Sequence, residues 1–227
     1  MTYRPPAYGS SYTVGPPLRQ RSGTSSTEVL HLTIAFIVLT FDLMLILGGD
    51  TFYAGDVPQI AAVAASAALT GFLLHEMAHK VAAQMGGYWA EFRLSPFGLF
   101  ISVITAAAGF LFAAPGATMI GGMGDVRDWG RTSLAGPATN FVFSLGFLSA
   151  TVVTNSVAAW SYAAPFLLFL AFINGWFAAF NMIPFGPLDG AKVLRWNRTV
   201  WVSSFVLFAA LAGFLYFSLT VGFVPTL

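Results

Sequence analysis

Apolar runs long enough to cross a membrane recur along most of the chain, separated by short polar stretches. A helix needs about 20 predominantly apolar residues to span the hydrocarbon core of a bilayer. By that criterion the pattern predicts five transmembrane helices. They are expected at residues 29–48, 57–85, 134–154, 161–183 and 200–222.

A sixth apolar stretch, residues 97–122, is interrupted by Pro115 and Gly116. It forms either one further crossing or a segment that enters the membrane and returns to the same side. Cytoplasmic loops of membrane proteins collect Lys and Arg. If the N-terminus is cytoplasmic and residues 97–122 make no net crossing, all ten basic residues lie on or at the edge of the cytoplasmic side. A full crossing would place Arg127 and Arg131 outside, so the charge pattern favours a re-entrant segment, which must pack against protein or line a cavity.

Composition supports a membrane protein, because only 8% of the residues are charged and 57% are hydrophobic. Soluble globular domains carry about a quarter charged residues. We therefore expect an all-α, multi-pass integral membrane protein with about six membrane-embedded segments; the family resemblance described below implies the cell membrane as its location. Residues 1–28 are rich in Pro, Gly, Ser and Thr and lack the apolar core of a signal peptide, so they are expected to form a flexible cytoplasmic tail. Residues 29–227 are expected to form a single membrane-embedded domain. The chain has no cysteine, which excludes disulfides and thiolate chemistry.

The second predicted helix contains an H-E-x-x-H pattern, formed by His75, Glu76 and His79. Side chains four residues apart on a helix project from one face, so both imidazoles can bind one metal ion. In this pattern the histidines bind zinc and the glutamate acts as general base toward water. The alternative is a pair of histidines hydrogen-bonded inside a helical bundle, but it leaves a glutamate in an apolar helix unexplained. Lys80 follows directly and is expected to extend to the cytoplasmic interface.

A catalytic zinc ion takes three protein ligands and a water molecule. The third histidine, His31, begins the first predicted helix and is expected to be an interfacial residue. Asp189 is the better candidate for the third ligand. The proline- and glycine-containing residues 184–187 end the preceding helix before Asp189, at the cytoplasmic end where His79 also lies. The alternative is that Asp189 caps a short helix starting near Gly190, and the two roles can coexist.

Together these two motifs resemble those of the site-2 protease family of intramembrane zinc metalloproteases. That family pairs H-E-x-x-H with N-x-x-P-x-x-P-L-D-G, and the sequence NMIPFGPLDG, Asn181 to Gly190, fits the second pattern position by position. The sequence LAGPATN, Leu134 to Asn140, resembles an A-G-P-x-x-N element that the family places at the start of its middle core helix. The resemblance covers roughly residues 57–195.

The resemblance implies a set of site residues. One zinc ion (Zn2+) per chain would be held by His75, His79 and Asp189, with Glu76 as the catalytic residue that activates water. Asn181 would be a second catalytic residue, which orients or stabilises the substrate near the metal.

The resemblance also implies how the fold is organised. The catalytic core would comprise three helices, at 57–85, 134–154 and 161–183. A re-entrant strand-like segment is expected after the H-E-x-x-H helix, and residues 115–122 could offer a strand edge to a substrate unwound from its helix. The PDZ and CBS domains that many family members carry are not expected in this chain.

The implied function is regulated intramembrane proteolysis, the hydrolysis of peptide bonds in or near transmembrane helices of membrane-protein substrates. The expected partners are such a substrate and the lipid bilayer, with no nucleic acid, and the sequence does not indicate an oligomeric state. Two alternatives are a zinc-binding membrane transporter and a non-catalytic relative that binds membrane helices. Transporters tend to place ligand sites along a path, often in paired repeats, whereas the candidate ligands of this chain cluster at one end.

Overall fold

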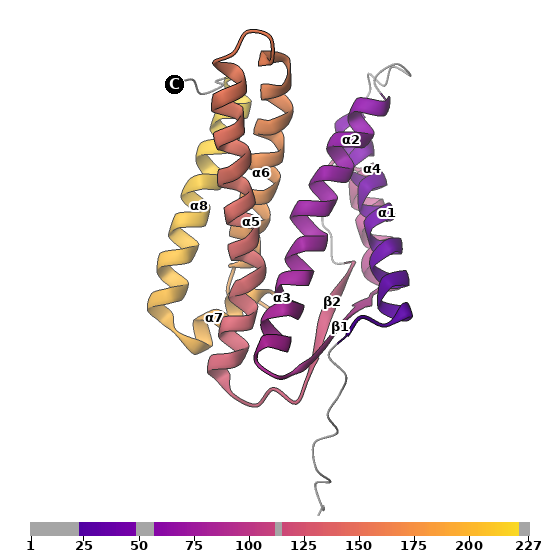
Figure 1. Ribbon diagram of the computed structural model, residues 1–227, viewed down its shortest axis with the longest axis vertical. Coiled ribbons are helices and arrows are strands. Elements are labelled where there is room, and N and C mark those ends of the chain that lie inside the picture. The colour runs from indigo at the N-terminus through magenta and orange to yellow at the C-terminus, as the bar shows by residue number, and fades with distance from the viewer. Residues whose placement is uncertain (1–22, 49–56, 112–114, 223–227) are drawn as a thin grey trace, which may run out of the picture.

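The computed structural model describes residues 23–48, 57–111 and 115–222, so most of the predicted N-terminal tail lies outside the described residues. The chain folds as a bundle of helices with one small sheet (Figure 1). The helices are α1 (Ser26–Gly48), α2 (Val57–Ala68), α3 (Leu74–Met85), α4 (Pro96–Ala107), α5 (Val126–Asn155), α6 (Ala164–Asn181), α7 (Asp189–Trp196) and α8 (Arg198–Thr220). The strands are β1 (Trp89–Leu94) and β2 (Gly116–Gly121).

The structure confirms the predicted all-α membrane fold. Five helical segments are long and apolar enough to span a membrane: Ser26–Gly48, Val57–Met85, Val126–Asn155, Ser161–Asn181 and Arg198–Thr220. Their length and composition identify the chain as an integral membrane protein. The third span starts earlier than the predicted residue 134, because Asp125 caps α5 by accepting a 2.8 Å hydrogen bond from the Arg127 backbone N–H.

The segment between α3 and α5 has the predicted re-entrant form. It leaves the end of α3 as β1, continues through α4, and returns as β2 to the start of α5, at the same end of the bundle (Figure 1). The two strands pair antiparallel, with Trp89 opposite Gly121 and Leu94 opposite Gly116. The 12 residues of α4 reach about 18 Å, which is less than the hydrocarbon core of about 30 Å. The sixth apolar stretch, residues 97–122, therefore contains a half-length helix and a strand.

A π-helical turn, Leu69–Leu73, joins α2 to α3 within the second span and lies directly before the H-E-x-x-H residues. Turns of this kind are often found at functional sites. Gly71 sits in the turn because a Cβ there would lie 2.8 Å from the ring of Phe177 on α6. The backbone carbonyls of Thr70 and Gly71 both accept hydrogen bonds from the Asn140 side chain on α5.

The elements fall into two groups that meet along α3 and α5 (Figure 1). The N-terminal group comprises α1 to α4 and the sheet, and the C-terminal group comprises α5 to α8. One apolar core spans both groups, because Leu39, Ala67 and Phe92 cluster with Leu170 of α6. A second core, with Met182, Val193 and Phe208, lies within the C-terminal group. The seam between the groups is where side chains from both can meet.

Lys80 does not extend to an interface as expected from the sequence, because it is only 4% exposed. Its ammonium group forms an ion pair with Glu28, which is fully buried on α1. Glu28 also accepts a 2.9 Å hydrogen bond from the backbone N–H of Phe92 on β1. A charge is costly to bury unless it is paired, so the buried ammonium group of Lys80 needs the Glu28 carboxylate. The ion pair therefore fastens α1, α3 and β1 together.

Candidate metal centre

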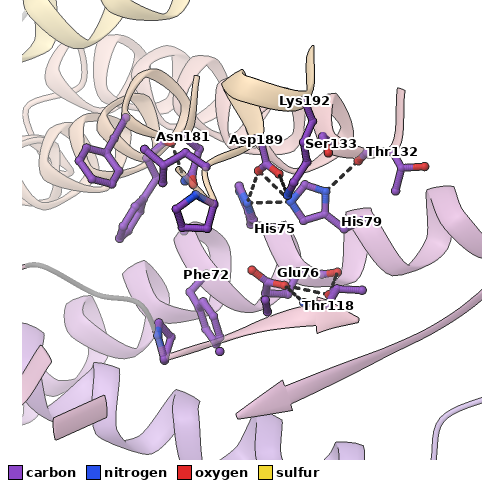
Figure 2. Close-up of a pocket in the computed structure, with 18 of the residues that line it drawn as sticks. Phe72, His75, Glu76, His79, Thr118, Thr132, Ser133, Asn181, Asp189 and Lys192 are labelled. Carbon is purple, nitrogen blue, oxygen red and sulfur yellow. Dashed lines mark hydrogen bonds and ion pairs between the residues drawn. The ribbon is translucent and has the colours of Figure 1, made fainter. Parts of the chain in front are cut away.

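His75 and His79 project from one face of α3, as their spacing predicts, toward α5 and α7 (Figure 2). Both side chains are buried, and their Nε2 atoms lie 3.0 Å apart. Two imidazole nitrogens so close together in a buried site need a shared partner, which a metal ion supplies.

The other ring nitrogen of each histidine is held by α5. The Nδ1 of His79 donates to the Thr132 carbonyl at 2.8 Å, and the Nδ1 of His75 donates to the side-chain oxygen of Asn140 at 2.5 Å. Because these oxygens only accept, the Nδ1 atoms carry the protons and the Nε2 lone pairs face the centre. Carbonyl partners of this kind orient metal-binding histidines in zinc proteins.

The turn of α5 before Pro137 presents its backbone to the site. Pro137 lacks an N–H, so the Ser133 carbonyl, four residues earlier, lacks its usual helical donor. The neighbouring Thr132 carbonyl accepts from His79, and the side chain of Asn140, at the end of the A-G-P-x-x-N element, accepts from His75.

Asp189 comes to the histidines from the C-terminal group. Its Oδ2 lies 3.0 Å from His79 Nε2 and 3.4 Å from His75 Nε2. Leu188, and not Asp189, occupies the cap position of α7, and no side-chain cap bond forms there. The capping role considered for Asp189 is therefore wrong, and its carboxylate is available to the histidines. Gly190 allows this approach, because a Cβ there would lie 2.0 Å from the Met182 carbonyl oxygen.

The charge state of Asp189 fits a ligand. Burial raises the pKa of this carboxyl, but the histidines, when protonated on both ring nitrogens, lower it more through their charge and their hydrogen bonds. The net effect holds the pKa of Asp189 well below its ordinary value, so the carboxylate is ionised at neutral pH.

These three residues fit a zinc ion by geometry as well as by chemistry. Their ligand atoms all lie within 4.8 Å of one another, and the pairwise distances of 3.0–3.4 Å match the spacing of about 3.3 Å between tetrahedral ligands that are about 2.0–2.1 Å from zinc. Gly136 on α5 leaves the necessary space, since a Cβ there would lie 2.4 Å from His79 Nε2 and 2.6 Å from His75 Nε2.

Glu76 lies on the opposite side of the two histidines from Asp189, against strand β2 (Figure 2). Its carboxylate oxygen Oε2 accepts hydrogen bonds from the Thr118 backbone N–H at 2.9 Å and from the Thr118 hydroxyl at 2.8 Å. Sequence analysis did not identify Thr118 as a partner of Glu76, because this contact joins residues 42 positions apart.

A cavity of about 190 Å³ opens between the metal centre and β2. The histidines, Glu76 and Asp189 line it, together with Asn181 and Lys192. The Asn181 amide donates to the Phe177 carbonyl of its own helix at 3.0 Å, and the Lys192 ammonium lies 3.5 Å from Asp189 Oδ1. The structure thus brings all five residues suggested by the sequence to one cavity.

A buried amide network behind His75 was not identified as functional from the sequence. Asn140, which holds His75, also donates to the side-chain oxygen of Asn174 on α6 at 3.2 Å, and Asn174 donates to the Thr70 hydroxyl at 2.9 Å. Neither asparagine is exposed to solvent. Their position in apolar spans was an available signal, because polar side chains at that depth are usually functional.

Comparison with known proteins gives two relatives that share a description. The chain is 30% identical over 186 residues to "Putative zinc metalloprotease MJ0611" of Methanocaldococcus jannaschii, a match that covers 78% of this chain and 88% of that protein. It is 28% identical over 134 residues to "Putative zinc metalloprotease Rip3" of two Mycobacterium tuberculosis strains, covering 57% of this chain and 30% of that protein. No protein-family model matches the chain, and no solved structure matches it significantly.

Proposed function

The chain belongs to the site-2 protease family of zinc metalloproteases, and on that premise we propose that it hydrolyses peptide bonds in or near the transmembrane helices of membrane-protein substrates. One observation carries the proposal. His75, His79 and Asp189 converge beside Glu76 in a cavity that residues of four membrane-spanning segments line together with β2 and α7. A metalloprotease centre in that position acts on peptide segments that reach it within the bundle.

In the proposed reaction, His75, His79 and Asp189 hold one zinc ion, and Glu76 handles the proton. Zinc bound there supplies a Lewis acid that lowers the pKa of water and polarises the scissile carbonyl. Glu76 accepts a proton from the attacking water as the new C–O bond forms. It then delivers that proton to the peptide nitrogen as the C–N bond breaks, which releases an amine and a carboxylic acid.

The remaining cavity residues position the reactants. The histidine Nδ1–H groups donate to Thr132 and Asn140, which leaves each Nε2 without a proton and fixes the orientation of the rings. We assign Asn181, in the cavity wall beside the Asp189 loop, the role of orienting the substrate.

We propose that the substrate docks as an extended strand on β2. Residues Pro115 to Thr118 line the cavity, which places this strand beside the metal centre. Adding an extended peptide to a sheet edge satisfies the backbone groups that unwinding a helix exposes. Residues with weak helix propensity near the cleavage position, such as Gly or Pro, would favour that unwinding.

We place the protein in the cell membrane with the metal centre at the cytoplasmic end. The basic residues of the described spans and loops support this orientation, because they gather at the end of the bundle where α7 and the sheet lie.

Replacing Glu76 tests the mechanism. Purified Glu76→Gln should retain about one zinc ion per chain, because the ligands are unchanged, and should cleave a reconstituted transmembrane substrate at least about 100-fold more slowly. Glu91→Gln is the matched control. Glu91 lies on β1 in an ion pair with Arg93, outside the cavity, and its replacement should leave cleavage near wild type.

Normal cleavage by Glu76→Gln would contradict the mechanism. Zinc flux into proteoliposomes without any cleavage by the wild type would instead identify the protein as a transporter.

A further inference from the structure

The direction of the backbone groups on β2 follows from the contacts of its partner strand. Neighbouring residues of an antiparallel strand point their N–H groups alternately toward and away from the partner. The N–H of Phe92 donates to Glu28 on α1 and therefore points away from β2. Phe92 is opposite Thr118, so the Thr118 N–H in turn points away from β1, to the free edge of β2.

Glu76 already occupies this position at the free edge. The Thr118 N–H, which an added strand would use, donates to Glu76 Oε2 at 2.9 Å. The Thr118 hydroxyl reaches the same oxygen at 2.8 Å and the Glu76 backbone carbonyl at 3.1 Å (Figure 2). Thr118 thus links β2, the strand that lines the cavity, to the Glu76 carboxylate.

A strand docked along β2 competes with Glu76 for that N–H, and β2 is packed closely against β1. Gly116 packs so closely on β1 that a Cβ would lie 2.3 Å from the Arg93 carbonyl oxygen and 2.5 Å from the Phe92 ring. The Glu76 side chain, with rotatable bonds and partial exposure, is the part that can adjust. The Thr118 hydroxyl has no role in strand pairing and remains available to the carboxylate.

We propose that Thr118 is a positioning residue that couples substrate docking to the orientation of Glu76. When a substrate strand pairs with β2, the Thr118 N–H passes to a substrate carbonyl, and the Thr118 hydroxyl alone then holds the Glu76 carboxylate for proton transfer. This inference rests on the proposed function, since it assumes that Glu76 is the general base and that β2 receives the substrate.

Two replacements at residue 118 separate the hydroxyl from the strand. Thr118→Val keeps the backbone N–H and the β-branched shape but removes the hydroxyl, and Thr118→Ser keeps the hydroxyl. We expect Thr118→Val to lower kcat about tenfold, the effect of one hydrogen bond to a charged group, with KM within about twofold. Thr118→Ser should restore kcat, and both variants should retain zinc. Thr33→Val is the matched control, because the Thr33 hydroxyl bonds the Val29 carbonyl of its own helix.

Wild-type kcat in Thr118→Val, or an equal loss in Thr118→Ser, would overturn the proposal. Failure of the wild type to cleave any substrate would count against the proposed function, and a second measurement tests Thr118 independently of cleavage. In protein labelled with ¹⁵N-threonine, the Thr118 amide proton should move upfield in Glu76→Gln and stay in place in Glu91→Gln. An amide signal unaffected by Glu76→Gln would show that the carboxylate does not hold this N–H.

Discussion

At the scale of single residues, Gly136 is the residue whose replacement most directly tests the metal centre. Gly136→Ala should abolish stoichiometric zinc binding, because the added Cβ would lie 2.4–2.6 Å from the two Nε2 atoms. Gly146→Ala on the same helix is the matched control, since nothing lies within 4 Å of its added Cβ. Zinc content is measured by elemental analysis of purified protein in both variants. Full zinc occupancy in Gly136→Ala would contradict the proposed ligand set.

The chemical groups of the site could be predicted from the sequence, but the contacts that position them could not. The spacing of His75 and His79 and the prolines before Asp189 were sufficient, because helix periodicity and helix termination are local properties. Thr118 and Asn174 were missed because their partners lie far away in the chain. No local pattern marks a residue that is functional only through a distant contact.

At the scale of elements, hydropathy predicted the five spans because each is a long apolar run. It predicted α4 and β2 only as one ambiguous stretch, since a short apolar segment suits a half-length helix or a strand equally well. The π-helical turn and the early start of α5 lay beyond this reasoning. The first depends on packing of Gly71 against Phe177, and the second on a polar segment that hydropathy excludes from a span.

The Glu28–Lys80 ion pair is the contact that fastens three of these elements. Lys80→Met should lower the free energy of unfolding by about 3–5 kcal/mol, because it leaves the Glu28 carboxylate buried without its cation. The double variant Glu28→Gln, Lys80→Met should recover much of that loss, since no uncompensated charge remains. Thermal unfolding in detergent gives the comparison. Equal stability of the wild type and Lys80→Met would show that the pair does not fasten α1 to α3.

At the scale of the whole molecule, the charge pattern was sufficient to predict that the segment after α3 returns to the end it left. A bias in Lys and Arg is a property of the entire chain and needs no knowledge of packing. The same pattern does not indicate that the helices divide into two groups or that the site lies on the seam between them. That division depends on which apolar faces pack together, and nearly uniform apolar spans do not encode their partners in a periodic pattern.

The proposed orientation can be tested with single cysteines, because the chain has none of its own. Arg127→Cys, at the start of α5, should be protected from a membrane-impermeant thiol reagent added to intact cells. Val157→Cys, beyond the other end of α5 and 39% exposed, should be labelled. The reverse labelling pattern would mean that the metal centre faces outward.

The seam between the two groups has a thermodynamic consequence. His75 and His79 belong to the N-terminal group and Asp189 to the C-terminal group, so an ion bound by all three adds a link to the apolar core that the groups share through Leu170. Binding to the assembled form alone stabilises it by about 2.7 kcal/mol when free zinc is at 100 times its Kd. Zinc binding and the association of the two groups of helices are therefore thermodynamically coupled. Removal of zinc would weaken that association as well as stop the proposed reaction.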